Sequence, residues 1–413
     1  MKKNVLLKAC IGMAVLFSIA SCNKSQDNNP VQATLPKIAL EDMVSEKGAN
    51  PDEAAIGENS VSDISALNRH DGNNGNRHFL YTESNAAGKN EIMRYEVLYN
   101  GKLHLDGSTA SGGNGTGKAL GSQGALALDK DHEWLFAVNA GSNSVSSFKV
   151  HNDGSLTLAH TEDTKGMGPV SLTIHGHLLY VLNRGSDAIH GFTIGSGGTF
   201  THIMGSTQYL SSTTVDAPQI SFTPDGGQVI VTEKATNIVG SFKVKNDGAV
   251  SHGTFTTSVG QTPFGFDFAR GRFMVVTNAA GGTAGAGSVS SYINANSGKA
   301  KDVNGAVPNG QGAPCWLVVT KFGRFAYASN TGSNNISSYY IAPWGALYLV
   351  QAIAGKSGLA PADIVVAANN YYVYALTAKS NSITGFSRKL LGGLTSIGDA
   401  TGLPASATGL VIY

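Results

Sequence analysis

The sequence has little cysteine and almost no net charge, and each shortage excludes a class of protein. Its three cysteines are Cys10, Cys22 and Cys315, and the first two lie in an N-terminal segment with targeting features. Cys315 would then be the only thiol in the folded part, which excludes an intrachain disulfide there. Lys and Arg number 29 against 28 Asp and Glu, and charged residues make up 14% of the chain. Without a basic excess the protein lacks the cationic surface that nucleic-acid binders need. We therefore expect no nucleic-acid partner and a fold stabilised by packing.

No apolar run beyond residue 20 reaches the roughly 18 residues that a membrane-spanning helix requires. Residues 1–8 are basic and residues 9–20 form a short apolar stretch, a pattern typical of a secretory signal peptide. This stretch ends in Ile19-Ala20-Ser21-Cys22, which resembles the lipobox of bacterial lipoproteins. The resemblance implies that residues 1–21 are a signal peptide and that Cys22 carries a lipid. The membrane contact would then be through the N-terminal lipid only, and the protein would lie in the cell envelope. The alternative is an ordinary signal peptide that happens to contain a cysteine.

Residues 22–76 are polar and rich in Asn, Ser, Asp and Glu, with no sustained strand alternation. Such a composition cannot bury much apolar surface. We interpret this segment as a tether with at most local order.

Residues 77–413 consist of one repeated unit. Seven apolar strands each end in a polar or small residue, and they occupy residues 79–83, 134–139, 179–183, 229–233, 274–278, 326–330 and 373–377. Each is followed by a loop rich in Gly, Ser and Asn and by a second strand that carries an aromatic residue. The aromatic residues are Tyr95, Phe148, Phe192, Phe242, Tyr292, Tyr339 and Phe386. Turns such as Asp153-Gly154 then lead into a further strand, and a longer loop leads, usually through a proline, into the next unit.

Each unit therefore holds four antiparallel strands, and no amphipathic helix pattern separates them. Seven such units at this period predict an all-β, seven-bladed β-propeller. Residues 407–413 form a lone apolar strand, while the first unit lacks an innermost strand. We expect the C-terminal strand to close the ring in the first blade, with Val411 beside Leu80. Closure would remove an exposed sheet edge.

The loops before the first strand and after the second strand of each blade share one face, around an axial pocket where ligands are expected. Polar residues at this face are the candidate substrate-binding residues: Glu83, Asn139, Asn183, Gln219, Asn278, Asn330 and Asp363. The asparagines have a structural alternative, because asparagine also bonds turn backbone and tolerates left-handed conformations. Gln219 and Asp363 are equally suited to capping a loop.

Three charged residues of neighbouring blades are the candidate catalytic group. Arg184 follows Asn183, and Glu233 and Lys234 end the corresponding strand of the next blade. Glu233 could act as general base on water, while Arg184 and Lys234 stabilise developing negative charge. The alternative is a solvated salt bridge at the rim.

Three other sequence features do not indicate functional sites. Residues 112–119 nearly spell a phosphate-binding loop, but Ala119 replaces the required Ser or Thr, and we expect a flexible insertion. His175 and His177 lie in a turn on the opposite face, and we expect no metal. Cys315 begins an inner strand with no histidine nearby in sequence, which favours a buried apolar role over that of a nucleophile. The sequence thus predicts no cofactor.

The repeats, particularly residues 179–189 and 312–330, resemble the seven-bladed propeller lactonase family, which includes propeller-type 6-phosphogluconolactonases and carboxymuconate cyclases. The resemblance implies that a lactone of a sugar acid or carboxymuconate type is hydrolysed or formed in the axial pocket without a metal. Arg184 matches the family's Asn-Arg-Gly pattern, and Glu233 stands where an acidic residue is common. The chain departs from the family where Gln219 follows Pro218 and where Cys315-Trp316 follows Pro314, because histidines are often found at those places.

Two functions remain open. The protein is either an envelope lactonase whose Arg184 and Lys234 bind a lactone or related anion, or a non-catalytic surface propeller that binds a glycan, small molecule or protein partner. Convergent charges in an open pocket favour chemistry, whereas a plugged or uncharged channel favours binding.

Overall fold

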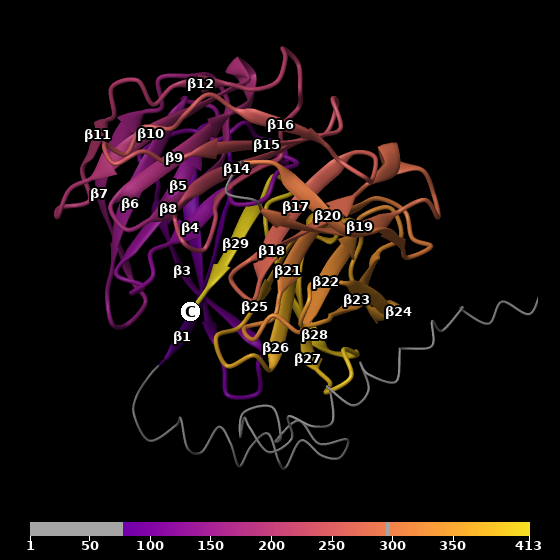
Figure 1. Ribbon diagram of the computed structural model, residues 1–413. Coiled ribbons are helices and arrows are strands. Elements are labelled where there is room, and N and C mark those ends of the chain that lie inside the picture. Colours follow the sequence, from indigo (N-terminus) through magenta and orange to yellow (C-terminus); the bar gives the residue numbers. More distant parts are fainter. Residues whose placement is uncertain (1–76, 295–297) are drawn as a thin grey trace, which may run out of the picture. The chain divides into compact units, whose positions relative to one another are not determined.

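Seven antiparallel sheets follow one another around a central axis in the computed structural model, which describes residues 77–294 and 298–413 (Figure 1). The expected signal peptide, the lipidated Cys22 and the tether lie outside the described residues. Blade 1 contains β29, β1, β2 and β3, and blade 2 contains β4–β7. The remaining blades are β8–β12, β13–β16, β17–β20, β21–β24 and β25–β28, numbered 3 to 7. The prediction of a seven-bladed, all-β propeller is confirmed.

The innermost strands line the axis, and each lies beside the innermost strand of the next blade all the way around the ring. They are β29 (Thr408–Ile412), β4 (Leu126–Leu128), β8 (Pro169–His175), β13 (Gln219–Phe222), β17 (Pro263–Ala269), β21 (Pro314–Val319) and β25 (Pro361–Val366). The second strands are those recognised from the repeat: β1 (His78–Glu83), β5 (Trp134–Asn139), β9 (Leu178–Asn183), β14 (Gln228–Glu233), β18 (Phe273–Asn278), β22 (Phe325–Asn330) and β26 (Tyr372–Thr377).

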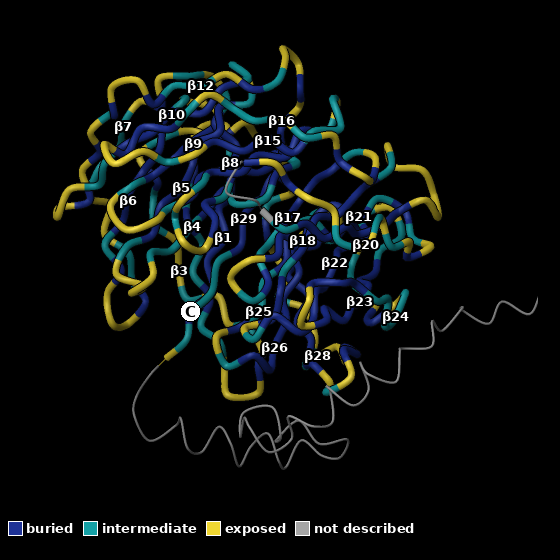
Figure 2. Tube along the Cα trace, in the orientation of Figure 1, coloured by how far each residue is buried: buried dark blue, intermediate teal, exposed yellow. Residues whose placement is uncertain are grey.

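The third strands carry the aromatic column, and all seven of its rings are buried at 1% exposure or less. These strands are β2 (Glu91–Val97), β6 (Ser144–Val150), β10 (Ala188–Ile194), β15 (Ile238–Lys243), β19 (Ser288–Asn294), β23 (Asn335–Ile341) and β27 (Ser382–Arg388). The buried strands and exposed turns alternate along the chain (Figure 2). The core therefore lies between neighbouring blades, where the faces of adjacent sheets meet.

The outer strands are more exposed and less regular. They are β3 (Leu103–Ala110), β7 (Leu156–Asp163), β11 (Phe200–His202), β12 (Gln208–Tyr209), β16 (Thr254–Thr257), β20 (Ala300–Pro308), β24 (Leu347–Lys356) and β28 (Leu394–Thr401). In blade 3 both β11 and β12 pair with β10. Short 3-10 turns follow three second strands, at Arg184–Ser186, Ala280–Gly282 and Ala378–Ser380. Within the described ranges no helix is both long and apolar enough to cross a membrane.

The C-terminal strand closes the ring, as the sequence predicts. β29 pairs antiparallel with β1, and backbone bonds in both directions join Phe79 and Tyr413 at 3.1 and 3.2 Å. The register differs by one residue from the expectation, because Val411 lies opposite Tyr81 and Ile412 lies opposite Leu80. The Phe79–Tyr413 pair sets this register, and a bulge between Tyr81 and Glu83 absorbs the offset farther along. In Figure 1 the yellow β29 lies beside the indigo β1.

Deletion of residues 408–413 should open the ring. We expect it to lower the free energy of unfolding by more than about 5 kcal/mol, because loss of one buried leucine such as Leu410 costs about 2–5 kcal/mol and the backbone pairing of β1 is lost as well. Ile412→Val, which keeps the strand, should cost only about 1 kcal/mol. Denaturant unfolding of both variants measures this, and a truncated chain as stable as Ile412→Val would contradict closure by β29.

Candidate functional site

The axis of the propeller is occupied by its own chain. Residues 120–123, here called the axial plug, precede blade 2 but bond to blades across the ring. Gln123 donates its backbone N–H to the carbonyl of Pro218 in blade 4 at 3.0 Å. Its side chain pairs with the backbone of Leu317 in blade 6, with Nε2 donating at 2.7 Å and Oε1 accepting at 3.2 Å. A single residue can reach blades 4 and 6 together only from the centre of the ring.

Ser122 is held in the same way. Its hydroxyl donates to the carbonyl of Val170 in blade 3 at 2.8 Å, and its carbonyl accepts the indole N–H of Trp316 in blade 6 at 2.9 Å. The plug is thus bonded to three blades besides its own. No sequence pattern indicated the plug, because partners such as Ser122 and Trp316 lie 194 residues apart.

The segment that leads into the plug is not the flexible insertion that we expected from residues 112–119. The side chain of Asn85 in blade 1 bonds both Thr116 and the backbone of Lys118, at 2.5 to 3.0 Å. Gly115 packs directly on the backbone of Asn85, where a Cβ would come within 2.1 Å. The small residues of this segment therefore allow a close approach of backbone to backbone.

Arg184 and Lys234 meet at a carboxylate that sequence reasoning missed. Asp216 lies 3.5 Å from the Arg184 guanidinium and 3.0 Å from the Lys234 ammonium. The Lys234 ammonium also lies 4.7 Å from the ring centre of Phe264. Asp216 keeps 52% of its side chain exposed, whereas both cations are largely buried. Its position two residues before Pro218, in a loop that leads to the axial face, is the signal that could have identified it.

Arg184 also holds the plug. Its guanidinium donates to the carbonyls of Leu120 at 2.6 Å and Gly121 at 3.4 Å. Burial lowers the pKa of Arg184, and the charge of Asp216 opposes that effect. The guanidinium therefore contacts two backbone carbonyls of the plug as well as Asp216.

Glu233 does not join this group, although we expected it to act as the general base. Its side chain is fully buried, and its carboxylate accepts bonds from the Ser211 backbone at 3.0 Å, from the Ser211 hydroxyl and from the Thr236 hydroxyl at 2.6 Å. Glu233 is the last residue of β14, whereas Lys234 begins the turn that follows, so the two neighbouring side chains have different surroundings. Glu233 fixes the start of the loop that carries Asp216.

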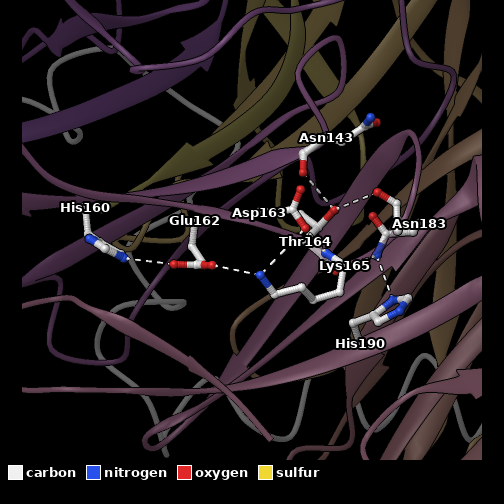
Figure 3. A network of polar contacts seen from close by, with 9 residues as sticks. Asn143, His160, Glu162, Asp163, Thr164, Lys165, Asn183 and His190 are labelled. Atoms are coloured by element: carbon white, nitrogen blue, oxygen red, sulfur yellow. Dashed lines mark hydrogen bonds and ion pairs between the residues drawn. The ribbon is translucent and has the colours of Figure 1, made fainter.

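The residues predicted to ring the pocket lie inside the blades instead. Glu83, Asn139, Asn183, Asn278 and Asn330 have no exposed surface. The four asparagines use their side-chain amides to bond third-strand residues at 2.8 to 2.9 Å, which are Ser146, His190, Ser290 and Ser337 respectively. Figure 3 shows the bond of Asn183 to His190. These bonds also differ from the structural alternative, because none of the four asparagines has a left-handed conformation and their amides bond mainly to third-strand side chains.

Burial shifts the pKa of Glu83, and of His190 beside Asn183, against the charged form. Burial raises the pKa of Glu83 well above its usual range, and Asn90 donates one bond to it at 3.0 Å. Burial lowers the pKa of His190 to about 4, with His202 adding to the effect. Neutral His190 can accept the bond from the Asn183 amide. With a pKa of about 4, His190 carries no charge at neutral pH.

Gln219 and Asp363 link neighbouring blades. The Gln219 amide bonds the backbone of Phe266 in blade 5 in both directions, at 2.7 and 2.9 Å. Asp363 in blade 7 accepts the backbone N–H of Leu410 in blade 1 at 3.0 Å and that of Ile364 at 2.8 Å. Such bonds from inner-strand side chains hold adjacent blades in register around the axis.

Asp363 also lines a cavity of about 280 Å³ beside the plug. The cavity lies between the plug, blades 6 and 7 and the C-terminal strand, and its walls are mainly small apolar side chains with Trp316 and Leu376. Its polar groups are Ser122, Thr331, Asp363, Lys379 and Thr408. Asp363 is only 3% exposed, and burial raises its pKa to about 7.

Cys315 is buried, and burial raises the pKa of its thiol to about 11. A thiol with so high a pKa is a poor nucleophile at neutral pH. Among residues 77–294 and 298–413 no group of three His, Cys, Asp or Glu side chains could hold a metal ion.

The sequence matches the family model of the seven-bladed β-propeller lactonases over residues 69–213 and 309–408. The chain belongs to this family. The matched residues of this lactonase propeller include Arg184, the plug and Asp363, while Asp216 and Lys234 fall between the two matched ranges. No curated protein sequence matches the chain.

Solved structures share the fold of this lactonase propeller. A candidate 6-phosphogluconolactonase of Bacteroides fragilis is 19% identical, with a TM-score of 0.67 over 82% of this chain and 98% of that one. A protein of Lactobacillus plantarum is 17% identical, with a TM-score of 0.68 over 82% and 99%. The periplasmic gluconolactonase of Pseudomonas aeruginosa is 17% identical, with a TM-score of 0.62 over 81% and 98%. At these identities the similarity shows the fold alone.

Removal of the plug's bonds should cost stability. Gln123→Ala leaves the N–H and carbonyl of Leu317 without their partners, and we expect it to lower the free energy of unfolding by about 1–3 kcal/mol. The matched control is Gln261→Ala, an exposed glutamine for which we expect a change within about 0.5 kcal/mol. Denaturant unfolding compares the two, and equal effects would mean that the plug is not held as described.

Asp363 should make stability depend on pH. Because its folded-state pKa of about 7 lies above the ordinary value, the folded protein keeps a proton there that the unfolded chain loses above about pH 4. The stability that Asp363 contributes is complete at low pH and is lost as pH rises to about 7. The quantity to compare is the difference in free energy of unfolding between the unmodified protein and Asp363→Asn. We expect this difference to fall by about 2–4 kcal/mol over this pH range.

The control is Asp225→Asn, at a carboxylate whose pKa is lowered mainly by a bond from the Thr223 hydroxyl. A lowered pKa gives the opposite pH dependence of stability. The difference in free energy of unfolding between the unmodified protein and Asp225→Asn should therefore stay constant above about pH 4 and shrink in more acidic solution. Denaturant unfolding from pH 4 to 8 measures both. If the difference in free energy of unfolding between the unmodified protein and Asp363→Asn does not change with pH, Asp363 is ionised in the folded protein over the whole range.

Proposed function

We propose that this protein hydrolyses a lactone of a sugar acid or carboxymuconate type at the face where Arg184 and Lys234 converge. The observation that carries the proposal is the placing of two cations from adjacent blades around one exposed carboxylate, Asp216. Membership of the lactonase family supports the choice of reaction. Cations held this close to a common point stabilise the oxyanion that forms when a carbonyl is attacked.

In this mechanism Asp216 takes the role that the sequence suggested for Glu233. Asp216 accepts a proton from a water molecule as the water oxygen attacks the lactone carbonyl carbon. The resulting oxyanion is stabilised by Lys234 and Arg184. The ring C–O bond then breaks, and Asp216 returns the proton to the departing alkoxide. One lactone and one water thus give one hydroxy acid, and no cofactor takes part in these steps.

The loop around Asp216 is fixed independently of the cations. Asp187 accepts the backbone N–H groups of Thr214 and Val215 at 2.7 and 3.2 Å, and Glu233 accepts that of Ser211. A base held by its neighbours in this way loses little entropy when substrate binds. This arrangement supports Asp216 as the proton acceptor.

The second candidate is a propeller that binds the same class of anion, a glycan or a protein without turning it over. The axial plug favours this candidate. It lies at the centre of the ring, and its Leu120 and Gly121 carbonyls already accept hydrogen bonds from the Arg184 guanidinium. We further propose that the protein is delivered to the cell envelope and anchored by a lipid on Cys22. Labelling with a radioactive fatty acid, lost in Cys22→Ser, tests the anchor.

The catalytic proposal is tested on the chain 23–413 with a panel of sugar-acid and carboxymuconate lactones. We expect Asp216→Asn to lower kcat/KM by about 100-fold or more while the Tm changes little, because this exposed carboxylate loses its proton-accepting function but keeps its shape. The matched control is Glu133→Gln, an exposed carboxylate that pairs with Lys149 at 2.7 Å, and it should leave kcat/KM within about twofold.

Full activity in Asp216→Asn would remove Asp216 from the mechanism. Binding of a lactone or its hydroxy acid without any turnover by the unmodified protein would establish the second candidate. In that case Lys234→Met should weaken binding of the acid and leave the Tm nearly unchanged.

A further inference from the structure

One end of the propeller carries the turns that join first to second and third to fourth strands, and we call it the turn end. In blades 5, 6 and 7 these turns are rich in cations. Four of them reach the surface and are called the basic edge: Arg270 and Arg272 between β17 and β18, Lys321 between β21 and β22, and Lys389 at the β27–β28 turn. Arg324 and Arg388 lie beneath them and are each only 4% exposed.

The basic edge is continuous across the three blades. Gly323 packs so closely on the blade 5 turn that a Cβ there would lie 2.6 Å from the Arg270 backbone nitrogen. The Lys321 backbone N–H donates to the side chain of Asn370 in blade 7, and the Arg388 side chain donates to the carbonyl of the same residue at 2.8 Å. The cations of neighbouring turns therefore form one row.

The four cations of the basic edge, Arg270, Arg272, Lys321 and Lys389, form no ion pair with a carboxylate of the described residues. Asp302, just beyond the outer turn of blade 5, accepts the backbone N–H of Gly305 with both oxygens. Asp267, on the inner strand of blade 5, accepts bonds from Phe268 and Val319.

Large apolar side chains are exposed in the same row of turns. Trp344 in the outer turn of blade 6 is 48% exposed, and Leu391 in that of blade 7 is 43% exposed. The row continues into blade 1, where Tyr99 is 78% exposed and its carbonyl accepts a bond from Tyr372 of blade 7. Exposed Trp, Tyr and Leu beside Lys and Arg are the composition with which proteins enter the headgroup region of a membrane.

The turn end is unevenly charged. The corresponding turns of blades 2 and 4 carry six acids, Asp129, Asp131, Glu133, Asp153, Asp225 and Asp247, beside four lysines, Lys130, Lys149, Lys243 and Lys245. The turns of blade 3, residues 175–177 and 195–199, contain no Asp, Glu, Lys or Arg. An anionic surface would therefore attract blades 5 to 7 more strongly than blades 2 to 4.

We propose that the turn end of blades 5 to 7 docks on a membrane surface rich in anionic phospholipid. The basic edge meets the lipid phosphates, and Trp344, Leu391 and Tyr99 enter the interface. Each Lys or Arg near such a surface contributes about 1 kcal/mol, and the attraction acts within a Debye length.

The course of the chain supports this partner over a soluble polyanion. The second strand β1 begins at the turn end with His78, so the 55 residues 23–77 join the propeller to the expected lipid on Cys22 from this side. A chain of that length spans at most about 180–200 Å, which permits the turn end to reach the membrane. Attachment at Cys22 would raise the effective concentration of the basic edge at the surface. Arg184, Lys234 and Asp216 lie at the opposite end of the blades and would face away from the lipid.

The test uses chain 23–413, which lacks the lipid but contains the closed propeller, with vesicles of phosphatidylcholine alone or with about a third of phosphatidylglycerol. We expect binding only to the anionic vesicles, and at least tenfold weaker binding for the variant Arg272→Gln, Lys321→Gln and Lys389→Gln. The matched control removes three cations from blades 2 and 4, with Lys130→Gln, Lys149→Gln and Lys245→Gln, and should change binding by less than about twofold.

Two further readouts identify the surface. The fluorescence of the protein should shift to shorter wavelength on anionic vesicles. Trp344→Phe should abolish that shift, because Trp316 is buried and the partly buried Trp134 lies in blade 2, outside the proposed docking surface. Binding to soluble dextran sulfate should be weaker than to vesicles. Equal loss in the two triple variants, no binding to anionic vesicles, or dextran sulfate binding without vesicle binding would each overturn the proposal.

Discussion

The pairing of β29 with β1 is the constraint on which the rest of the structure depends. Four-stranded blades are held mainly by the apolar faces that they bury against their neighbours, so an open row of blades would leave two faces and two strand edges in water. The bonds between Phe79 and Tyr413 remove both edges. Only in the closed ring do loops from blades 3, 4 and 6 surround a common axis, and only there can one short segment bond to all three.

The axial plug determines which groups lie together at the centre of the closed ring. Ser122 and Gln123 bond the inner strands of distant blades, and Arg184 donates to the carbonyls of Leu120 and Gly121. The centre of the ring is therefore divided, with the Arg184–Asp216–Lys234 group on the side of blades 3 and 4 and the Asp363 cavity on the side of blades 6 and 7. A ligand at the cationic group is bounded by protein backbone rather than by an open channel.

The fold was predictable from the sequence because its signal is local and repeated. Alternating strands, aromatic residues and glycine-containing turns recur seven times, and the unpaired strand at the C-terminus indicated closure. The site was less predictable, because it depends on the direction of single side chains. Lys234 points to Asp216 while adjacent Glu233 is buried under Ser211. The asparagines were correctly placed at strand ends, but each bonds a third-strand residue inside its own blade.

Residues that no local pattern marks were missed for a related reason. Asp216 lies in a loop without periodicity, and the role of the plug depends on contacts between residues 194 apart. The clustering of cations at the turn end of blades 5 to 7 is also invisible in the composition, since basic and acidic residues nearly cancel over the whole chain. Such features arise only when the ring arranges distant turns on one surface.

Hydrogen–deuterium exchange of the β29 amides is the most direct measurement of ring closure. If β29 is an integral inner strand of blade 1, its amides should exchange only through global unfolding, at the rate of the buried second strand β5. Exchange as fast as that of the outer strand β16 would show that the C-terminal strand detaches from the folded protein, and closure by β29 would be contradicted.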